Sequence, residues 1–142
     1  MPSVDSFPAP SADGHHANRV VLEMHSDSVA IVSLFGEHDL GHYEQLKVAF
    51  DTAAVRRRNL VVDLSACAFI DSTVISLLLY AQREITCDGG RFVVVIHADA
   101  GSVARVAEIT HLFELVPVYA SLAAAVESAE SFSSARRRSS GT

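Results

Sequence analysis

Short runs of aliphatic residues alternate along the chain with longer stretches in which apolar residues recur every three or four positions. Two runs, 19–24 and 28–35, are separated by only three polar residues, and this spacing predicts an antiparallel hairpin. The valine-rich runs 59–64 and 91–96 are typical of buried strands, and 115–119 is expected to form a last short strand.

The stretches between these runs have the spacing of amphipathic helices. The first helix is expected to begin at Asp39 or Leu40 and to end at the basic run 56–58, because cations suit the negative end of a helix dipole. Residues 71–87 form the clearest helical pattern, which ends at Asp88-Gly89-Gly90. The segments 102–109 and 121–130 predict two shorter helices.

Strands that are separated by helices imply parallel pairing through right-handed crossovers. The predicted fold is therefore α/β: a mixed, mostly parallel sheet with an N-terminal antiparallel hairpin, layered with about four helices. Residues 1–18 are rich in proline, serine and alanine, and residues 131–142 are serine-rich with a basic Arg136-Arg137-Arg138 run. Both segments are expected to be disordered tails around one domain, residues 19–130.

The composition narrows the class of protein. Hydrophobic residues make up 49% of the chain, which is enough for a real core, and the formal net charge is −6. A net acid repels nucleic-acid backbones and anionic membranes, so direct nucleic-acid binding is not expected. No uncharged apolar run approaches the roughly 18 residues of a membrane span, and the N-terminus does not resemble a signal peptide. We expect a cytoplasmic protein with a protein or small-molecule partner, whose two cysteines, Cys67 and Cys87, are reduced core thiols.

The sequence lacks the common catalytic and nucleotide-binding motifs. Its one lysine, Lys47, lies within a predicted helix, which excludes a P-loop and leaves no strand lysine for a phosphoacceptor receiver domain. Glycines do not form a dinucleotide-binding run, and Ser72 lacks the flanking glycines of a nucleophile elbow. The histidines His15-His16, His38 and His42 are too scattered to predict a metal site. We therefore expect no enzyme activity, no catalytic residues, no cofactor and no metal.

Residues 67–73 leave a strand and enter the clearest helix. Asp71 or Ser72 is expected to cap that helix by accepting hydrogen bonds from its first backbone amides. A serine at this place can also be a modification site, because the helix dipole and the amides stabilise a phosphate there. Phosphorylation would add about two negative charges beside Asp71 and repel a docked partner.

Five motifs follow one another in order: LFGEHD at 34–39, VVDLS at 61–65, FIDST at 69–73, GGRFVVV at 89–95 and VARVAEITHLF at 103–113. On these motifs the chain resembles a STAS domain, and more narrowly a bacterial anti-sigma factor antagonist, over about residues 20–126. The resemblance implies a STAS-type fold and a partner that is an anti-sigma factor with serine kinase activity and an ATP-binding fold. Binding would release a sigma factor, phosphorylation at Ser72 would separate the complex, and a phosphatase would reset it.

The resemblance also implies the residues of the site. Ser72 would be the phosphorylated residue, with Thr73 as the secondary candidate. The partner-binding surface would comprise Gly36, Glu37, His38, Asp39, Asp71, Ser72, Thr73 and Val74. The family usually has glycine where this chain has Val74, and a β-branched side chain adds bulk at the docking helix.

Two alternatives stay open beside this function. The chain could be an antagonist that is regulated through Cys67 and Cys87 or through its tails. It could also be a STAS scaffold or a module that binds a nucleotide or lipid without phosphorylation.

Overall fold

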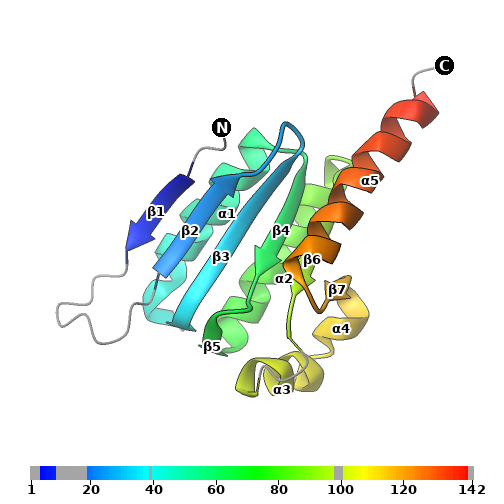
Figure 1. The fold of residues 1–142 in the computed structure, drawn as a ribbon. Coiled ribbons are helices and arrows are strands. Elements are labelled where there is room, and N and C mark those ends of the chain that lie inside the picture. Colours follow the sequence, from blue (N-terminus) through cyan, green and yellow to red (C-terminus); the bar gives the residue numbers. More distant parts are fainter. Residues whose placement is uncertain (1–3, 9–18, 39, 98–100, 141–142) are drawn as a thin grey trace.

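The computed structural model describes residues 4–8, 19–38, 40–97 and 101–140, so Asp39 and the adjacent histidines His15-His16 lie outside the described residues. The helices and strands follow one another along the chain as shown in Figure 1. They are β1 (Val4–Pro8), β2 (Arg19–Met24), β3 (Val29–His38), the 3-10 helix η1 (Leu40–His42), α1 (Tyr43–Arg56), β4 (Asn59–Asp63), β5 (Cys67–Ile70), α2 (Ser72–Cys87), β6 (Phe92–Val95), α3 (Ser102–Ile109), α4 (Leu112–Leu115), β7 (Val118–Tyr119) and α5 (Leu122–Ser140).

The strands that the structure describes form one mixed sheet in the order β1-β2-β3-β4-β6-β7, with β5 beside the end of β3. The hairpin β2–β3 is antiparallel, as predicted, with Val21 opposite Ser33. The pairs β3–β4, β4–β6 and β6–β7 are parallel. The predicted class, a mostly parallel sheet with an N-terminal antiparallel hairpin, is confirmed.

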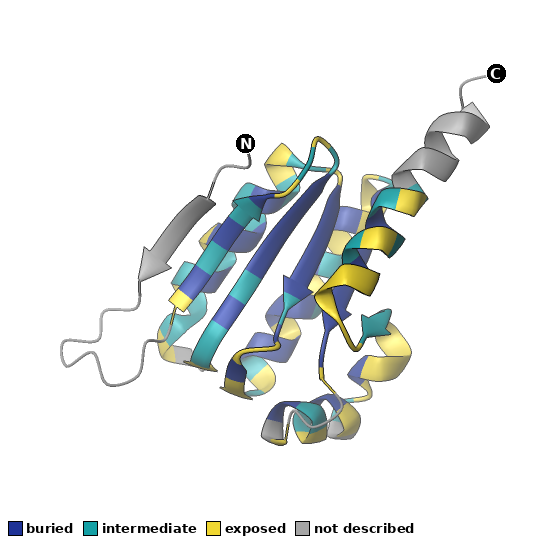
Figure 2. Ribbon diagram, viewed as in Figure 1, coloured by how far each residue is buried: buried dark blue, intermediate teal, exposed yellow. Residues whose placement is uncertain are grey.

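Helices cover both faces of the sheet, with α1 and α2 on one face and α5 on the other (Figure 1). Alternate strand residues point to opposite faces, and this explains the two clusters of buried side chains. Val32 and Val62 point to the α1–α2 face, while Ile31 and Val61 point toward α5. The burial pattern in Figure 2 shows that the central strands are buried on both faces, as a parallel sheet between helices requires.

Polar contacts fix α5 on its face of the sheet. The Asn59 side chain is fully buried, donates from Nδ2 to the carbonyl oxygen of Ala129 at 3.2 Å, and accepts from the Arg91 amide at 2.9 Å. Ser128 of α5 accepts hydrogen bonds from Arg91 Nε at 2.9 Å and from the Tyr119 hydroxyl at 2.8 Å. These bonds join α5 to β4, to Arg91 just before β6 and to β7, and so set the position of the last helix.

The structure differs from the sequence prediction at both ends of the chain. Val4–Pro8, expected to be part of a disordered tail, pairs antiparallel with β2 as an added edge strand. The last helix was expected to end at Glu130, but α5 extends through the basic run to Ser140. The boundaries of the domain, 19–130, stay a prediction.

Two short elements inside the domain were also not predicted. Residues 67–70 form β5, and residues 112–115 form α4 just before the last strand, which is shorter than expected. The glycine pair after α2 has the expected role: Gly89 has a φ of 81°, and a Cβ on Gly90 would lie 1.9 Å from the Arg58 carbonyl oxygen. Glycine at position 90 therefore allows the end of α2 to approach the chain that leads into β4.

Candidate functional site

The candidate site lies where the end of β3 meets the start of α2. The short strand β5 runs parallel to the last residues of β3, with Glu37 opposite Phe69 and His38 opposite Ile70. The register shifts between Gly36 and Glu37, and Gly36 has a φ of 84°. This pairing places residues 36–38 beside the segment that leads directly into Asp71 and Ser72.

Asp71 is the N-cap of α2. Its Oδ1 accepts a hydrogen bond from the Val74 amide at 3.1 Å, and Ser72 is the first residue of the helix. This geometry decides between the two candidate caps, because the cap is supplied by Asp71 and does not require the Ser72 hydroxyl. Ser72 is exposed and Thr73 is half-buried, so Ser72 is the more accessible of the two hydroxyls.

Two residues that the sequence analysis assigned to the partner-binding surface are buried. Val74 is 1% exposed and packs in the core, and His38 is 0% exposed, with its Nε2 2.9 Å from the Phe35 carbonyl oxygen. The side chains of His38 and Val74 are therefore not accessible at the surface, and a role for these two residues in partner binding stays a prediction. The valine bulk at position 74 fills the core and does not project from the docking helix.

One residue that the sequence analysis did not assign lies on this surface. Phe69 is 38% exposed although it lies within β5, and its register partner Glu37 is also exposed. We call the exposed or half-buried residues Gly36, Glu37, Phe69, Asp71, Ser72 and Thr73 the switch surface. Its exposed aromatic side chain, Phe69, is of a type that is enriched in protein–protein interfaces.

The cysteines differ from each other in environment. Cys67 is buried as expected, and burial raises the pKa of its thiol to about 11, although a contact with the Phe69 carbonyl oxygen opposes the shift. Cys87 was also expected in the core, but it is the last residue of α2 and is exposed. A thiol with the pKa of Cys67 is almost entirely protonated at neutral pH, so regulation through Cys67 has little chemical support.

A hollow of about 280 Å³ lies between α1 and α2 beside Ser72. We call it the α1–α2 hollow; it is lined by Tyr43, Lys47, Ser72, Thr73, Ser76, Leu77 and Tyr80. Lys47, one of its lining residues, donates from Nζ to Asp51 Oδ2 at 2.9 Å, and its ammonium lies 5.2 Å from the centre of the Tyr80 ring.

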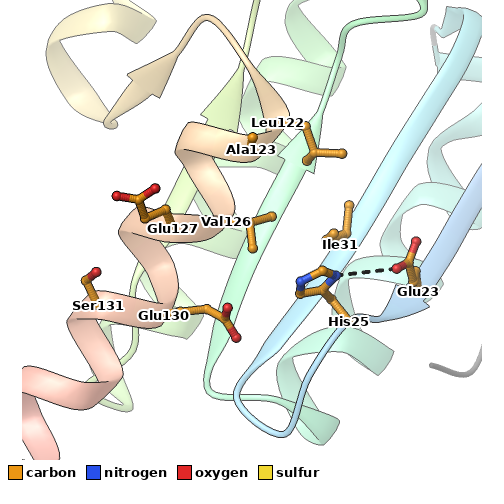
Figure 3. A pocket seen from close by; sticks show the side chains of 9 residues that line it. All are labelled: Glu23, His25, Ile31, Leu122, Ala123, Val126, Glu127, Glu130 and Ser131. Atoms are coloured by element: carbon orange, nitrogen blue, oxygen red, sulfur yellow. Dashed lines mark ion pairs between the residues drawn. The ribbon is translucent and has the colours of Figure 1, made fainter. Parts of the chain in front are cut away.

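A larger hollow of about 750 Å³ lies on the opposite face, between α5 and the β2–β3 hairpin (Figure 3). Ile31, Leu122 and Val126 supply apolar lining. The lining also includes the carboxylates of Glu23, Glu127 and Glu130, and one imidazole, His25, which lies 3.6 Å from Glu23. An acidic lining of this kind disfavours an anionic ligand such as a nucleotide or an acidic lipid.

The described residues contain no group of three metal-ligating side chains. In the same part of the chain, no helix is long and apolar enough to cross a membrane.

A comparison with protein-family models identifies one family. The family model described as STAS domain matches residues 21–125. A crystal structure of an anti-sigma factor antagonist from Mycobacterium paratuberculosis is similar to the chain with a TM-score of 0.68 and 25% identity, over 90% of this chain and 95% of that one. A search of functionally characterised proteins found no significant sequence match.

The fold is also similar to that of SpoIIAA, an anti-sigma factor antagonist whose structure is known in two forms. The unphosphorylated form has a TM-score of 0.61 and 23% identity, and the match covers 76% of this chain and 94% of that one. The phosphorylated form, from Bacillus, has a TM-score of 0.58 and 23% identity, over 76% and 96% of the two chains. At this identity the likeness shows the fold alone.

Proposed function

The chain belongs to the STAS domain family, and from this premise we propose that it is an anti-sigma factor antagonist that phosphorylation at Ser72 switches off. The unphosphorylated chain binds an anti-sigma factor that is also a serine kinase, and this binding releases a sigma factor. A phosphatase returns the phosphorylated chain to its binding state. In this role the chain is a binding protein of the cytoplasm and catalyses no reaction itself.

The observation that carries the proposal is the position of Ser72. It is exposed on the first turn of α2, directly after the cap Asp71 and beside the exposed residues Glu37 and Phe69. A hydroxyl in this position is accessible to a kinase, and it lies in the part of the surface that a partner would cover. Thr73 is less exposed and remains the secondary candidate.

The phosphorylation step is an ordinary phosphoryl transfer that the partner would catalyse. The Ser72 oxygen forms a bond to the γ-phosphorus of ATP, the bond to the β-phosphate oxygen breaks, and ADP and a proton are released. The product carries about two additional negative charges at the start of a helix, where backbone amides and the dipole stabilise them. The domain therefore stays folded while a docked partner is repelled, because like charges in an interface are unfavourable by several kcal/mol.

The valine at position 74 is compatible with this function. Its side chain packs in the core, 1% exposed, so it adds no bulk to the surface around Ser72. The Val74 amide is also used, since it donates to Asp71 and fixes the start of α2. The departure from the family glycine is thus a difference in core packing beneath the switch surface.

The alternative function, a module that binds a nucleotide or lipid, would need a suitable cavity. The hollow beside α5 has the necessary size, but its lining carries the three carboxylates of Glu23, Glu127 and Glu130. Anionic headgroups and phosphates would be repelled there. We therefore favour the protein-binding function.

The experiment that tests the proposal combines the purified chain with candidate anti-sigma kinases from the same organism and ATP. Intact-mass and peptide mass spectrometry locate any phosphate, and size-exclusion chromatography follows the complex. We expect phosphate on Ser72, loss of the complex as it accumulates, and neither event in Ser72→Ala, with Thr73→Ala as the matched control that behaves as wild type. Binding to none of the kinases would refute the proposal, and binding without phosphate on Ser72 would refute the switch.

A further inference from the structure

The α1–α2 hollow brings polar side chains from two helices to Ser72. Tyr43 and Lys47 lie one helical turn apart on α1, and Ser72, Ser76 and Tyr80 follow one another at the same spacing on α2. These two stripes line the same hollow, so Ser72 and Lys47 both contribute to the lining of one small cavity of about 280 Å³.

Lys47 is the one cation among the residues that line this hollow, and it is the only lysine of the chain. Its ammonium is held by Asp51 at 2.9 Å and lies over the Tyr80 ring. The hydrogen bond that Lys47 donates to Asp51, followed by the negative charge of Asp51, raises the pKa of Lys47 above its ordinary value, so the side chain is charged at neutral pH.

The ion pair between Lys47 and Asp51 is weak enough for Lys47 to change its partner. Both side chains are well exposed, 36% and 45%, and exposed ion pairs contribute little to stability because water screens them. A lysine has a flexible stem with three rotatable donors, so its ammonium can turn to a better acceptor within reach. A phosphate dianion is such an acceptor, since it carries about two negative charges and three acceptor oxygens, whereas the Asp51 carboxylate carries a single charge.

We propose that Lys47 is the binding residue for the phosphate of phosphorylated Ser72: the ammonium moves from Asp51 to the phosphate and closes the α1–α2 hollow. The proposal rests on the proposed function only for the origin of the phosphate. Ser76 and the Tyr80 hydroxyl line the same space and supply further donors. The phosphate then connects α1 to α2, and the Asp51 carboxylate loses its partner.

This capture gives the switch a second effect beyond repulsion at Ser72. In the unphosphorylated chain the hollow is accessible to a partner side chain, and Lys47 offers that side chain a positive charge. In the phosphorylated chain the hollow is filled, its cation is neutralised and Asp51 adds an unpaired negative charge on α1. Phosphorylation thus changes the charge of the surface on both α1 and α2, although neither helix has to move.

The test uses a chain with phosphoserine installed at position 72 during translation, so that no kinase is needed. ³¹P NMR follows the second pKa of the phosphate, which is ordinarily about 6. A cation in contact lowers such a pKa by about one pH unit or more. We expect Lys47→Met to raise the phosphate pKa by about one pH unit relative to the otherwise unchanged phosphorylated chain, and Lys47→Arg to leave it low.

Arg83→Met is the matched control, because it removes one exposed cation from α2 outside the hollow. Arg83 lies about 16 Å along the helix from Ser72 at 1.5 Å per residue, and salt screens charges beyond about 10 Å. We expect the phosphate pKa of this variant to equal that of the parent. Equal phosphate pKa values in the parent and in Lys47→Met would overturn the proposal.

A second readout uses the single lysine of the chain. Labelling with ¹⁵N-lysine gives one side-chain ammonium signal, which we expect to shift when residue 72 carries phosphate and to lose its dependence on Asp51. If Lys47→Met does not fold, Asp51→Asn tests the same competition, since freeing Lys47 should lower the phosphate pKa further. An ammonium signal that is identical with and without the phosphate would contradict the capture.

These measurements separate the two proposals. A phosphate pKa that depends on Lys47 supports the capture even if no kinase phosphorylates Ser72, in which case only the proposed function fails. Phosphorylation of Ser72 by a partner kinase, with a phosphate pKa that is independent of Lys47, would leave the function intact and overturn the capture.

Discussion

Replacing Asp71 by alanine removes the side-chain acceptor at the start of α2. The lost interaction is the hydrogen bond from the Val74 amide to Asp71 Oδ1, 3.1 Å long in the structure. Loss of an N-cap destabilises a protein by about 1 kcal/mol. For a domain of this size, that change lowers the melting temperature by about 3 °C and the urea midpoint by about half a molar.

Two matched variants show whether the lost cap alone accounts for the loss of stability in Asp71→Ala. Asparagine is as good an N-cap as aspartate, so Asp71→Asn should change the unfolding free energy by only a few tenths of a kcal/mol. Ser72→Ala should be neutral or slightly stabilising, because Ser72 is in the helix and alanine is the better helix former.

Urea unfolding followed by circular dichroism measures all three variants against the parent chain. The reasoning would be refuted if Ser72→Ala lowered stability as much as Asp71→Ala, since Ser72 would then be the cap. In that case phosphorylation would remove the cap and unfold the start of α2. The proposal that the phosphorylated domain stays folded would then be wrong.

Three further outcomes are expected. Phe69→Ala should weaken binding to the anti-sigma partner by about ten- to a hundredfold in calorimetry, because exposed aromatic residues dominate such interfaces; unchanged affinity would place the interface elsewhere. Gly90→Ala should lower the unfolding free energy by about 1–3 kcal/mol, since the new Cβ would overlap the Arg58 carbonyl oxygen, and wild-type urea stability would contradict this. Iodoacetamide at pH 8 should label Cys87 and leave Cys67 unmodified, because the Cys67 thiol, with a pKa of about 11, is ionised in only roughly one molecule in a thousand. Mass spectrometry detects the label, and rapid labelling of both cysteines would contradict this expectation.

The central strands could be predicted from the sequence because their side chains are buried on both faces. Phe92–Val95 and Asn59–Asp63 are nearly continuous apolar runs, which few other elements produce. β1 escaped prediction because an edge strand needs few apolar residues, and Val4–Pro8 has only valine and phenylalanine before its proline. Its pairing with β2 is a tertiary contact that local composition does not encode.

The candidate site was predicted in part. The sequence placed Ser72 at the start of a helix and residues 36–38 in its vicinity, and the parallel pairing of β3 with β5 brings them together. The burial of Val74 could have been found, because it lies four residues before Leu78 on the inward face of α2. His38 also continues the inward alternation of Val32 and Leu34.

The exposure of Phe69 could not have been found in the same way. The four residues of β5 have a buried, exposed, exposed, buried pattern, so strict alternation fails there. The strand lies beside the irregular end of β3, where the register shifts. Only the three-dimensional pairing shows that this phenylalanine faces outward, three residues before Ser72.

The most direct test of the proposed function is the affinity of the chain for the anti-sigma kinase that we propose as its partner, with and without phosphoserine at position 72. Titration calorimetry without ATP compares the two forms, and because phosphate is installed during translation, its position is certain. We expect the phosphorylated form to bind about a hundredfold more weakly, as several kcal/mol of like-charge repulsion implies. Equal affinities of the two forms would contradict the account.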